Sequence, residues 1–484
     1  MKNKKIYILF SILITLFCFA IVQKTFQNDT YSAIRIGDYI LHNGIDFVEH
    51  FNFNNLNYHN ARWLFNVLIA FVYNNFEFLG VYIFTIISSI ILGLTIFNTL
   101  LKRNKNLFIS FFVTLIAIGA SYSSLTARAQ IISYILLFLE VIFIEKLIDS
   151  NKKIYILILL IISVLIANIH TTIWPMVLIL FLPYFAEYII SKKFKKLKIL
   201  YSKTENIKIL FVTFIIIGLS GLLTPLGLLP YTYMFKTMSG ISATYITELQ
   251  KVNIFFDSKM FILTIIYLYL FVYLKKKIKI SDLFLISGLY AMSVMANRNI
   301  IFLVIIGSIS LSRLIMDSLE EYKDKFEIIT NKLYKDKLIM GILMSPVIIL
   351  IIVFIYINIY NKPYVDETIY PINAADYIVE NVDLENIRLY NDFNDGAYLE
   401  FRGIKVFLDS RSEVYCKEFN NTSILEDYAS INNMSKDYKP VFEKYNFNYV
   451  LLYLTGPLNS YISEDKDYEI VYYDDNFVLY KKVE

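Results

Sequence analysis

Long apolar runs separated by short polar clusters make up residues 1–360. Each run is about 15–25 residues long, near the roughly 20 residues that a helix needs to cross a hydrocarbon core. The pattern predicts a mostly α-helical, polytopic membrane bundle. We expect about eleven spans, at residues 6–23, 78–101, 107–121, 130–147, 154–169, 172–190, 208–224, 259–275, 281–296, 299–316 and 338–360.

The segment 62–76 is apolar, but we expect it to lie at the membrane interface because three asparagines interrupt it and Arg62 and Trp63 begin it. Leaving it out of the spans places every lysine-rich cluster on one side of the membrane. These clusters lie at residues 2–5, 102–105, 146–153, 192–198, 275–279 and 323–337. The positive-inside rule makes that side cytoplasmic, together with the N-terminus.

The opposite side then holds the first loop, 24–77, and the whole tail, 361–484. The tail is rich in Asp, Glu, Asn and Tyr. We expect strands at 388–391, 405–408, 449–454 and 477–481, and helices at 373–381, capped by Asn373, and at 435–445. The predicted organisation is therefore a transmembrane domain, 1–360, followed by a small extracytoplasmic α/β domain, 361–484.

Composition supports a membrane protein, because 57% of the residues are hydrophobic and only 18% are charged. A soluble protein has about a quarter charged residues. Cys18 lies in the first apolar run, so no disulfide with Cys416 is expected. The net charge of +4 is spread through the loops, and no nucleic-acid partner is expected.

Asp29 follows the first predicted span after a few residues, so its carboxylate is expected close to the membrane surface. A carboxylate there can act as the general base for an incoming hydroxyl group. It can also be an ordinary cap of a helix that begins near Thr30. Position alone leaves both interpretations open.

Two arginines lie near span ends on the lysine-poor side, Arg128 in T-A-R-A-Q and Arg298 in A-N-R-N. This placement runs against the usual charge preference, and a guanidinium group suits a phosphate. Each arginine is therefore either a phosphate contact or a snorkelling side chain. His170 ends another span on this side and is either a ligand or a hydrogen-bonded interface residue.

The sequence identifies no cofactor with certainty. The three histidines of the first loop have spacings that fit no zinc signature. A catalytic divalent metal ion held by Asp29, Asp46 or Glu49 stays open. In the tail, Asp409 and Arg411 either pair with each other or help to hold an acceptor.

Several short motifs lie in the loops of the lysine-poor side and in the tail. They are Asp29-Thr30-Tyr31, Ile36-Gly37-Asp38, Asn43-Gly44-Ile45-Asp46, Trp63-Leu64, Thr126-Ala127-Arg128-Ala129-Gln130, Asn168-Ile169-His170, Thr224-Pro225-Leu226-Gly227, Asn297-Arg298, Gly396-Ala397-Tyr398-Leu399 and Phe407-Leu408-Asp409-Ser410-Arg411. Together these motifs resemble one family, the integral membrane glycosyltransferases of the GT-C fold that use polyprenyl-phosphate sugars, and within it a bacterial, uncharacterised subgroup. The first loop departs from that pattern because it lacks prolines and has no second acid beside Asp29.

The resemblance implies transfer of a sugar from a polyprenyl-phosphate donor to an envelope glycan, lipid or protein at the outer face of the bilayer. It implies a single inverting displacement with Asp29 as the general base. The donor phosphate would contact Arg128, Arg298 and His170. The expected supporting or acceptor-binding residues are Tyr31, Asp46, Glu49, Arg62, Gln130, Asn168, Asn297, Asp409 and Arg411.

Three other functions fit parts of the pattern. A lipid-linked glycan flippase would share the spans and the phosphate contacts, but it should carry ionisable groups near the midplane. The central spans are nearly uncharged, Glu140 excepted. A glycan polymerase or ligase would share the lipid-linked substrate, and a cell-wall anchoring protein would use the tail.

Overall fold

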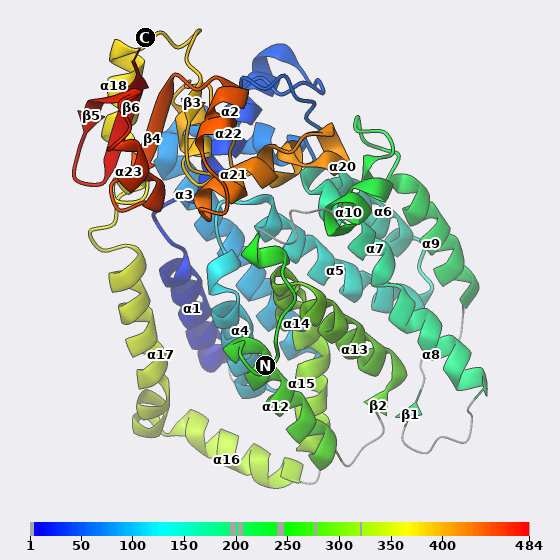
Figure 1. Ribbon diagram of the computed structural model, residues 1–484. Helices are drawn as coiled ribbons and strands as arrows, with labels where there is room; N and C mark the ends of the chain where they lie inside the picture. The colour runs from blue at the N-terminus through cyan, green and yellow to red at the C-terminus, as the bar shows by residue number, and fades with distance from the viewer. Residues whose placement is uncertain are drawn as a thin grey trace. The chain divides into compact units, whose positions relative to one another are not determined.

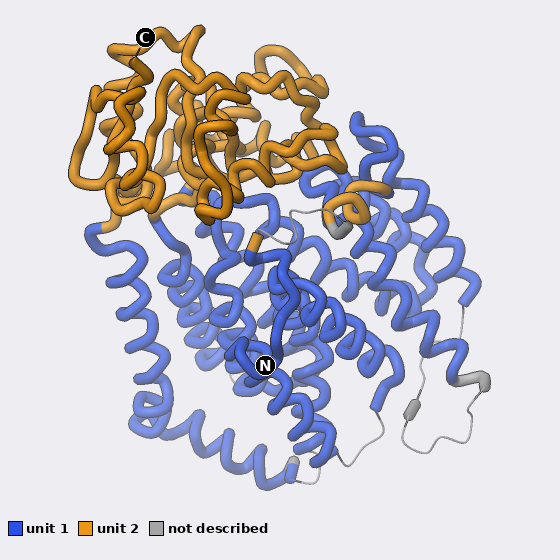
Figure 2. Tube along the Cα trace, viewed as in Figure 1, with its two compact units in different colours: residues 1–24, 82–231, 247–361 blue, residues 25–81, 232–246, 362–484 orange. Residues whose placement is uncertain are grey.

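The computed structural model describes residues 4–193, 200–201, 207–239, 246–274, 278–319 and 322–483. The chain forms two compact units, shown in Figure 2. We call residues 1–24, 82–231 and 247–361 the helical unit, and residues 25–81, 232–246 and 362–484 the mixed unit. This division differs from the predicted boundary after residue 360, because the first loop belongs to the same compact unit as the tail.

The helical unit consists of apolar helices, some of them broken (Figure 1). A two-residue parallel pair joins β1, Leu200–Tyr201, to β2, Ile278–Lys279. The helices are α1 Lys4–Ile21, the later part of α3 Trp63–Asn104, α4 Leu107–Ala120, η1 Tyr122–Ser124, α5 Ala129–Ser150, α6 Ile154–Ile169, η2 Thr171–Ile173, α7 Pro175–Ile179, α8 Leu182–Lys193, α9 Ile207–Ser220, η3 Thr247–Leu249, α12 Ser258–Tyr273, α13 Ile280–Met295, η4 Asn297–Asn299, α14 Ile300–Ile305, α15 Gly307–Ser318, α16 Lys323–Lys335 and α17 Lys337–Asn358.

Each predicted span corresponds to a helix or a broken helix, but the expected eleven spans are not confirmed. Four described stretches are long and apolar enough to cross a membrane, or five with the bent α14–α15 pair. The apolar helices α4, α6, α9, α12 and α13 have only 14 to 16 residues. Parts of the lysine-rich clusters at 2–5, 192–198 and 275–279 lie outside the described residues, so the orientation stays a prediction.

Breaks interrupt two apolar stretches, and only the second stretch, predicted as the span 299–316, was expected to be continuous. Inside α3, Glu77 adopts φ 52° and ψ −155°, which separates an N-terminal helical piece from the later apolar piece. This break falls between the predicted interfacial segment, 62–76, and the predicted span, 78–101. The second break lies between α14 and α15, whose axes differ by 50°.

The core of the helical unit forms where α1 packs against α4 and α17. Phe10 of α1 stacks on Phe111 of α4, with ring centroids 4.2 Å apart. At the other end of α1, the Asn358 amide nitrogen donates to the carbonyl oxygen of Ala20 at 3.0 Å, and its amide oxygen accepts from the Tyr122 hydroxyl at 2.8 Å. These hydrogen bonds pair the Asn358 side chain at the end of α17 with a carbonyl oxygen in the last turn of α1.

The mixed unit holds a four-stranded sheet in the order β3-β4-β6-β5. Strand β3 runs parallel to β4, and β6 is antiparallel to both β4 and β5. Its elements are α2 Asn28–Asn43, the first part of α3, most of α10 Leu229–Ser239, α18 Ile372–Asn381, β3 Leu389–Tyr390, α19 Gly396–Phe401, η6 Ser412–Tyr415, α20 Lys417–Asn420, α21 Ile424–Asn432, α22 Lys439–Tyr445, β4 Tyr449–Tyr453, α23 Pro457–Ile462, β5 Tyr468–Tyr473 and β6 Phe477–Lys482.

Three of the four predicted strands are present in this sheet, as β3, β4 and β6. The fourth, 405–408, is not a strand, because Val406 makes only isolated bridges, to Leu389 and to Asn52 of the first loop. The sequence did not predict β5, whose burial pattern lacks a regular alternation. The cap prediction for Asn373 is wrong, since α18 begins one residue earlier and Pro371 holds the cap position.

Aromatic side chains fill the core of the mixed unit. Phe407 lies at the centre, with ring centroids 4.7 Å from Tyr445 and 4.9 Å from Phe447. Tyr390 of β3 lies 5.0 Å from Phe442 of α22 in the same cluster. Such offset and edge-to-face contacts stabilise a core beyond the area that they bury. They fix the segment 405–411, which carries part of the candidate site.

Candidate functional site

Helix α2 places Asp29 in its first turn, where the carboxylate is only 6% exposed. A negative charge there is favoured because the backbone N–H groups of the first turn have no partners within the helix. The amide of Asp29 donates to the side-chain oxygen of Asn28 at 2.9 Å. Gln27 holds the cap position, so the interpretation of Asp29 as an ordinary cap is wrong.

Two side chains from distant segments meet the Asp29 carboxylate. Arg62 Nη1 lies 3.7 Å from Asp29 Oδ1, and the Ser410 hydroxyl donates to the same oxygen at 3.2 Å. Burial alone would lower the pKa of Arg62, but Asp29 and nearby Tyr58 and Glu413 raise it overall. Arg62 therefore stays charged, and Asp29 faces a cation inside a largely buried site.

A close contact between two helices holds α2 against the start of α3. A Cβ at Gly37 would lie 1.9 Å from the carbonyl oxygen of Asn66 and 2.8 Å from Ala70 Cβ. Only glycine allows the α2 backbone this close to α3. The contact fixes Asp29 and Arg62 within one small helical pair.

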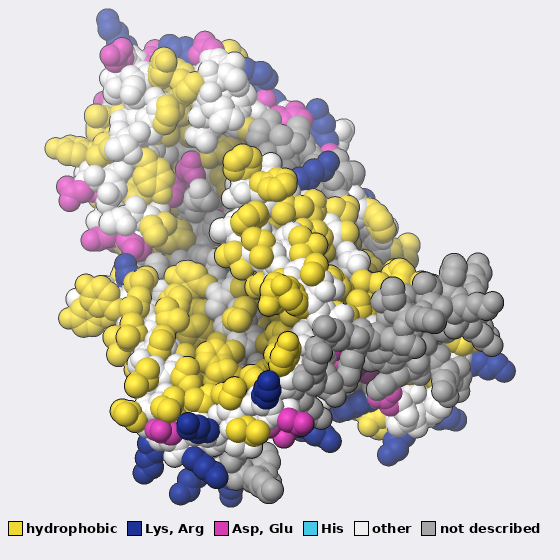
Figure 3. All heavy atoms as spheres, turned by 90° about the horizontal axis from the view of Figure 1, so that it is seen from below, with side chains coloured by type: hydrophobic (Ala, Val, Ile, Leu, Met, Phe, Trp, Pro, Cys, Tyr) yellow, Lys and Arg dark blue, Asp and Glu magenta, His cyan; other side chains and the backbone are white. Residues whose placement is uncertain are grey.

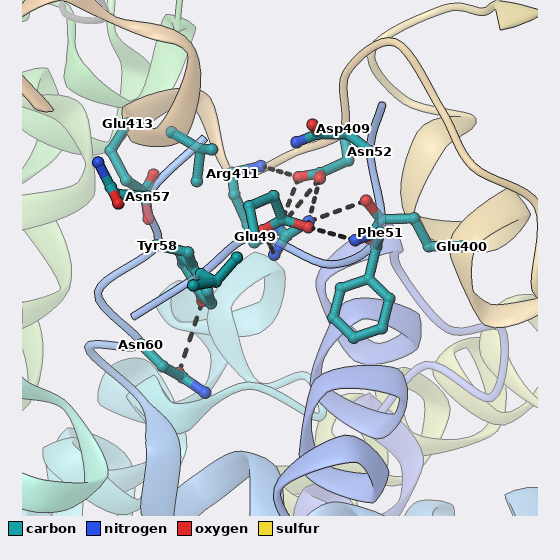
Figure 4. Close-up of polar contacts among 12 residues, drawn as sticks. Glu49, Phe51, Asn52, Asn57, Tyr58, Asn60, Glu400, Asp409, Arg411 and Glu413 are labelled. Atoms are coloured by element: carbon teal, nitrogen blue, oxygen red, sulfur yellow. Dashed lines mark hydrogen bonds and ion pairs between the residues drawn. The ribbon is translucent and has the colours of Figure 1, made fainter. Parts of the chain in front are cut away.

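A second cluster, fully buried, surrounds Arg411 (Figure 4). Arg411 binds Glu49 of the first loop at 2.6 Å, Glu400 of α19 at 2.8 Å, and Asp409 beside it in the chain. Its guanidinium group also lies 4.8 Å from the centre of the Tyr58 ring. The predicted Asp409–Arg411 pair is confirmed, as part of a larger cluster that we call the Arg411 cluster.

The Arg411 cluster brings one cation together with three carboxyl groups. Burial raises the pKa of both Glu49 and Glu400, only partly offset by Arg411. Burial would also raise the pKa of Asp409, but Arg411 and a hydrogen bond with Glu400 lower it to about 2. Burial and the neighbouring carboxylates therefore favour the protonated form of Glu400, whereas Arg411 favours the ionised form of Asp409.

The Arg411 cluster also positions Ser410, which lies between its two charged neighbours in sequence. The amide of Arg411 donates to Asp409 Oδ1 at 2.6 Å, which tightens the chain at this point. A Cβ at Gly396 would lie 2.1 Å from the carbonyl oxygen of Leu408, so α19 begins directly against the same segment. These constraints hold the Ser410 hydroxyl toward Asp29.

The remaining expected residues of the mixed unit have separate environments. Tyr31 packs edge-to-face against Tyr370 and Tyr398 at 5.0 and 5.3 Å. Asp46 accepts from the Tyr39 hydroxyl at 2.8 Å and contacts His50 at the same distance. Burial would raise the pKa of Asp46, but these two hydrogen bonds lower it overall.

In the helical unit, Arg128 and Arg298 lie at the beginnings of helical segments on different parts of the chain. Arg128 precedes α5 and lies 3.4 Å from Glu248 of η3. Arg298 lies in η4, and the backbone N–H of its neighbour Asn297 donates to the carbonyl oxygen of Gln250, just after η3. The η3–η4 contact therefore links the segment that carries Arg298 to the segment that carries the partner of Arg128.

His170 caps the end of α6 and is buried, with Nδ1 3.0 Å from the hydroxyl of Ser133, one turn into α5. The side-chain amide of Asn168 donates to the carbonyl oxygen of Leu223 at 2.9 Å and to that of Val164 at 2.8 Å. Gln130 lies in the first turn of α5. These contacts join α5, α6 and the chain after α9.

Within the described ranges, no group of three or more His, Cys, Asp or Glu side chains could hold a metal ion. The three carboxylates considered from the sequence have other main contacts. Asp29 faces Arg62, Asp46 faces His50, and Glu49 faces Arg411. A ligand set shared by Asp29, Asp46 and Glu49 therefore does not fit this structure. Cys18 and Cys416 are both buried and are not joined in a disulfide.

Comparison of the structure with solved structures decides the fold. The Archaeoglobus fulgidus oligosaccharyltransferase in its apo form matches 93% of this chain and 69% of its own, with a TM-score of 0.61 and 12% identity. The chain has the fold of an oligosaccharyltransferase. The expected GT-C-like fold is thereby confirmed, and the apolar helices identify a membrane protein.

Two further structures of the same archaeal protein match. AglB in complex with an inhibitory peptide and a dolichol-phosphate gives a TM-score of 0.55 at 11% identity, covering 93% of this chain and 69% of its own. The complex with Zn and sulfate gives 0.55 at 12% identity, covering 93% and 68%. No protein-family description and no curated protein matches the sequence. At this level of identity the likeness establishes the fold alone.

Sequence reasoning missed two residues of the site, Ser410 and Glu400. Ser410 lies inside the F-L-D-S-R motif, but only its charged neighbours drew attention. Glu400 directly follows the G-A-Y-L motif. Their contacts with Asp29 and Arg411 join chain segments that no local pattern relates.

Proposed function

We propose that this protein transfers a sugar or glycan from a polyprenyl-phosphate-linked donor to a cell-envelope acceptor, a glycan, lipid or protein. The observation that carries the proposal is the buried Asp29 carboxylate in the first loop of an oligosaccharyltransferase fold, held by Arg62 and Ser410. One neighbouring structure is a complex with an inhibitory peptide and a dolichol-phosphate, which supports a lipid-linked donor and a separate acceptor.

Asp29 takes the role of general base. As the acceptor oxygen attacks the anomeric carbon, its proton passes to the Asp29 carboxylate, and the bond from that carbon to the donor's phosphate oxygen breaks. The result is a single displacement with inversion. Arg62 lies 3.7 Å from the Asp29 carboxylate, and a nearby cation favours the charged form of a carboxyl group. Ser410 orients the carboxylate.

Arg128 and Arg298 take the role of phosphate contacts in the helical unit. The leaving phosphate gains negative charge as the bond breaks, and fixed guanidinium groups stabilise that charge. Arg128 has Glu248 beside it, an exposed carboxylate that the donor phosphate would replace. His170 is buried and bonded to Ser133, so we assign it a positioning role for the start of α5.

A neighbouring structure holds Zn and sulfate. In this chain the described carboxylates form no metal-ligand set, and Asp29 has a guanidinium partner instead. We therefore propose that Arg62, and not a metal ion, supplies the positive charge next to Asp29.

The decisive test compares Asp29→Asn with Asp38→Asn, an identical change on the same helix. Asp38 lies on the outer part of α2 and accepts from Asn74 at 2.8 Å. Each full chain is reconstituted in lipid nanodiscs with a lipid-linked sugar extract and envelope acceptors. Transfer of labelled sugar should be lost in Asp29→Asn, by about 100-fold or more, and kept in Asp38→Asn. Both variants should remain folded at the assay temperature, which thermal unfolding checks, although loss of the buried Arg62–Asp29 pair lowers the unfolding temperature of Asp29→Asn.

Full transfer by a folded Asp29→Asn protein would refute the role of Asp29. A glycan polymerase or ligase uses the same class of donor and is the second candidate. Product length separates the two, because a polymerase gives a ladder of products and a transferase gives one addition. A flippase would move labelled donor between leaflets without forming a product.

A further inference from the structure

The bend between α16 and α17 carries an unmatched group of basic side chains. Lys332 and Lys335 end α16, and Lys337 begins α17. With Ile328, Asn331, Asp336 and Leu338 they line an open hollow of about 810 Å³. Figure 3 shows Lys and Arg side chains gathered along one border of a largely hydrophobic face.

Several other basic side chains of the helical unit have acidic partners. Arg103 and Lys279 both contact Glu145, and Arg313 pairs with Asp282. Among the described residues, the structure records no ion pair for Lys332, Lys335 or Lys337. Their acidic neighbour, Asp336, already accepts two backbone hydrogen bonds. The hollow thus presents three uncompensated positive charges.

Asp336 sits among the three lysines, but its carboxylate caps α17. Its Oδ1 accepts from the amides of Leu338 and Ile339 at 3.0 and 3.1 Å. A cap of this kind stabilises the start of a helix. Asp336 therefore fixes the bend and leaves the lysines to an external anion.

The same helix exposes apolar side chains beside its lysines. The side of α16 around Phe326 and Thr330 packs toward the bundle. On the outer side Ile328 is 68% exposed and Ile329 is 55% exposed. A helix that carries lysines and exposed isoleucines on one face is typical of the membrane interface.

The position of the hollow relative to the membrane follows from its place at the start of α17. This helix of 22 residues, Lys337–Asn358, is long and apolar enough to cross the membrane, and the hollow lies at its first residue. Figure 1 shows α16 running across the end of α17. Leu338 and Ile342, 74% and 64% exposed, continue along the outside of α17 from the hollow. If the phosphate group of a phospholipid lay at the lysines, its acyl chains would lie beside Leu338 and Ile342.

We infer that the hollow at the α16–α17 bend binds the phosphate group of an anionic membrane phospholipid. Lys332, Lys335 and Lys337 contact the phosphate, and Ile328 and Leu338 contact the first part of the acyl chains. A zwitterionic lipid lacks the net negative charge that three lysines favour, so the site selects anionic headgroups. The inference is independent of the proposed transferase activity.

The test uses the purified full chain in neutral detergent, with native mass spectrometry to measure binding of phosphatidylglycerol, phosphatidylcholine and inorganic phosphate. We expect saturable binding of phosphatidylglycerol. The triple variant Lys332→Gln, Lys335→Gln, Lys337→Gln should weaken it by at least about tenfold, since each lysine near the surface contributes. Weak binding of phosphatidylcholine should not change.

A matched control changes three exposed lysines elsewhere in the same unit, Lys102→Gln, Lys152→Gln and Lys153→Gln. Binding within about twofold of wild type in this control supports the site, whereas equal losses in both triple variants would show general charge attraction and overturn it. Equal affinity for the two lipids, or displacement by inorganic phosphate, would also overturn it. Replacing the three site lysines by arginine keeps the charge and should retain binding, which separates loss of charge from misfolding.

Discussion

At the scale of single residues, the candidate site depends on how buried carboxyl groups are stabilised. The Asp29 carboxylate forms an ion pair with Arg62, and the Asp409 carboxylate forms one with Arg411. The sequence identified Asp29, Arg62, Asp409 and Arg411, because charged residues beside apolar runs stand out. It offered the Asp409–Arg411 pair as one alternative, but it could not show that Asp29 meets Ser410, since the two are 381 positions apart in the chain.

Asp395 lies buried in the mixed unit and accepts a hydrogen bond from the Tyr453 hydroxyl at 3.2 Å. Burial, and the nearby charge of Asp392, raise its pKa well above the ordinary value of 3.8. The folded state therefore holds this proton more tightly than the unfolded state. The resulting stabilisation is complete below pH 3.8 and is lost as the pH rises toward the folded-state pKa.

Asp395→Asn cannot ionise and keeps an oxygen that accepts from Tyr453. Its unfolding temperature should equal or exceed that of the wild type, and the difference should widen as the pH increases from about 4 to 8. Thermal unfolding of both proteins across this pH range measures the effect. A difference that stays constant with pH would show that the Asp395 carboxyl group does not titrate differently on folding.

At the scale of elements, apolar runs predicted helices well, because an apolar helix is one continuous segment and its residues follow one another in the sequence. Their breaks were harder to predict. The Glu77 break was indicated by the polar residues before it, whereas the α14–α15 bend has no proline and is marked only by the pair Gly307-Ser308, which begins α15. Strand β3, of two residues, is held in the sheet mainly by pairing with β4, far along the chain.

The close approach of α2 and α3 gives a prediction for Gly37→Ala. The added Cβ would meet the backbone oxygen of Asn66, which cannot move without shifting α3. We expect the free energy of unfolding to fall by about 1–3 kcal/mol. Gly288→Ala on α13 is the control, because no atom lies within 4 Å of its added Cβ. Chemical denaturation of both variants should show a loss only for Gly37→Ala.

At the scale of the whole molecule, the first loop and the tail form one compact unit, although residues 82–361 lie between them in the chain. The sequence predicted a tail domain that folds by itself. It could not show that the tail is completed by 25–81, because a buried contact such as Glu49–Arg411 has no local signature. The Arg411 cluster is the strongest polar link between the two segments.

Arg411→Met removes the cation and leaves Glu49 and Asp409 buried without it. Breaking such a buried pair costs about 3–5 kcal/mol, so the mixed unit should unfold at lower denaturant concentration. Hydrogen exchange should show faster exchange in residues 25–81 as well as in the tail. Arg402→Met breaks a more exposed pair with Asp376 and should cost about 1 kcal/mol or less. Unchanged exchange near Glu49 in Arg411→Met would contradict the link.

The Arg411 cluster can form only late in the synthesis of the chain. Glu49 and Arg411 are 362 positions apart, and a ribosome adds about 5–20 residues per second. The first loop therefore waits roughly 20 to 70 s for its partner. During that interval Glu49 and the aromatic side chains around it are open to water, chaperones and proteases. The last quarter of the chain thus acts as a late checkpoint, since only molecules translated to the end can close the segment that carries Asp29.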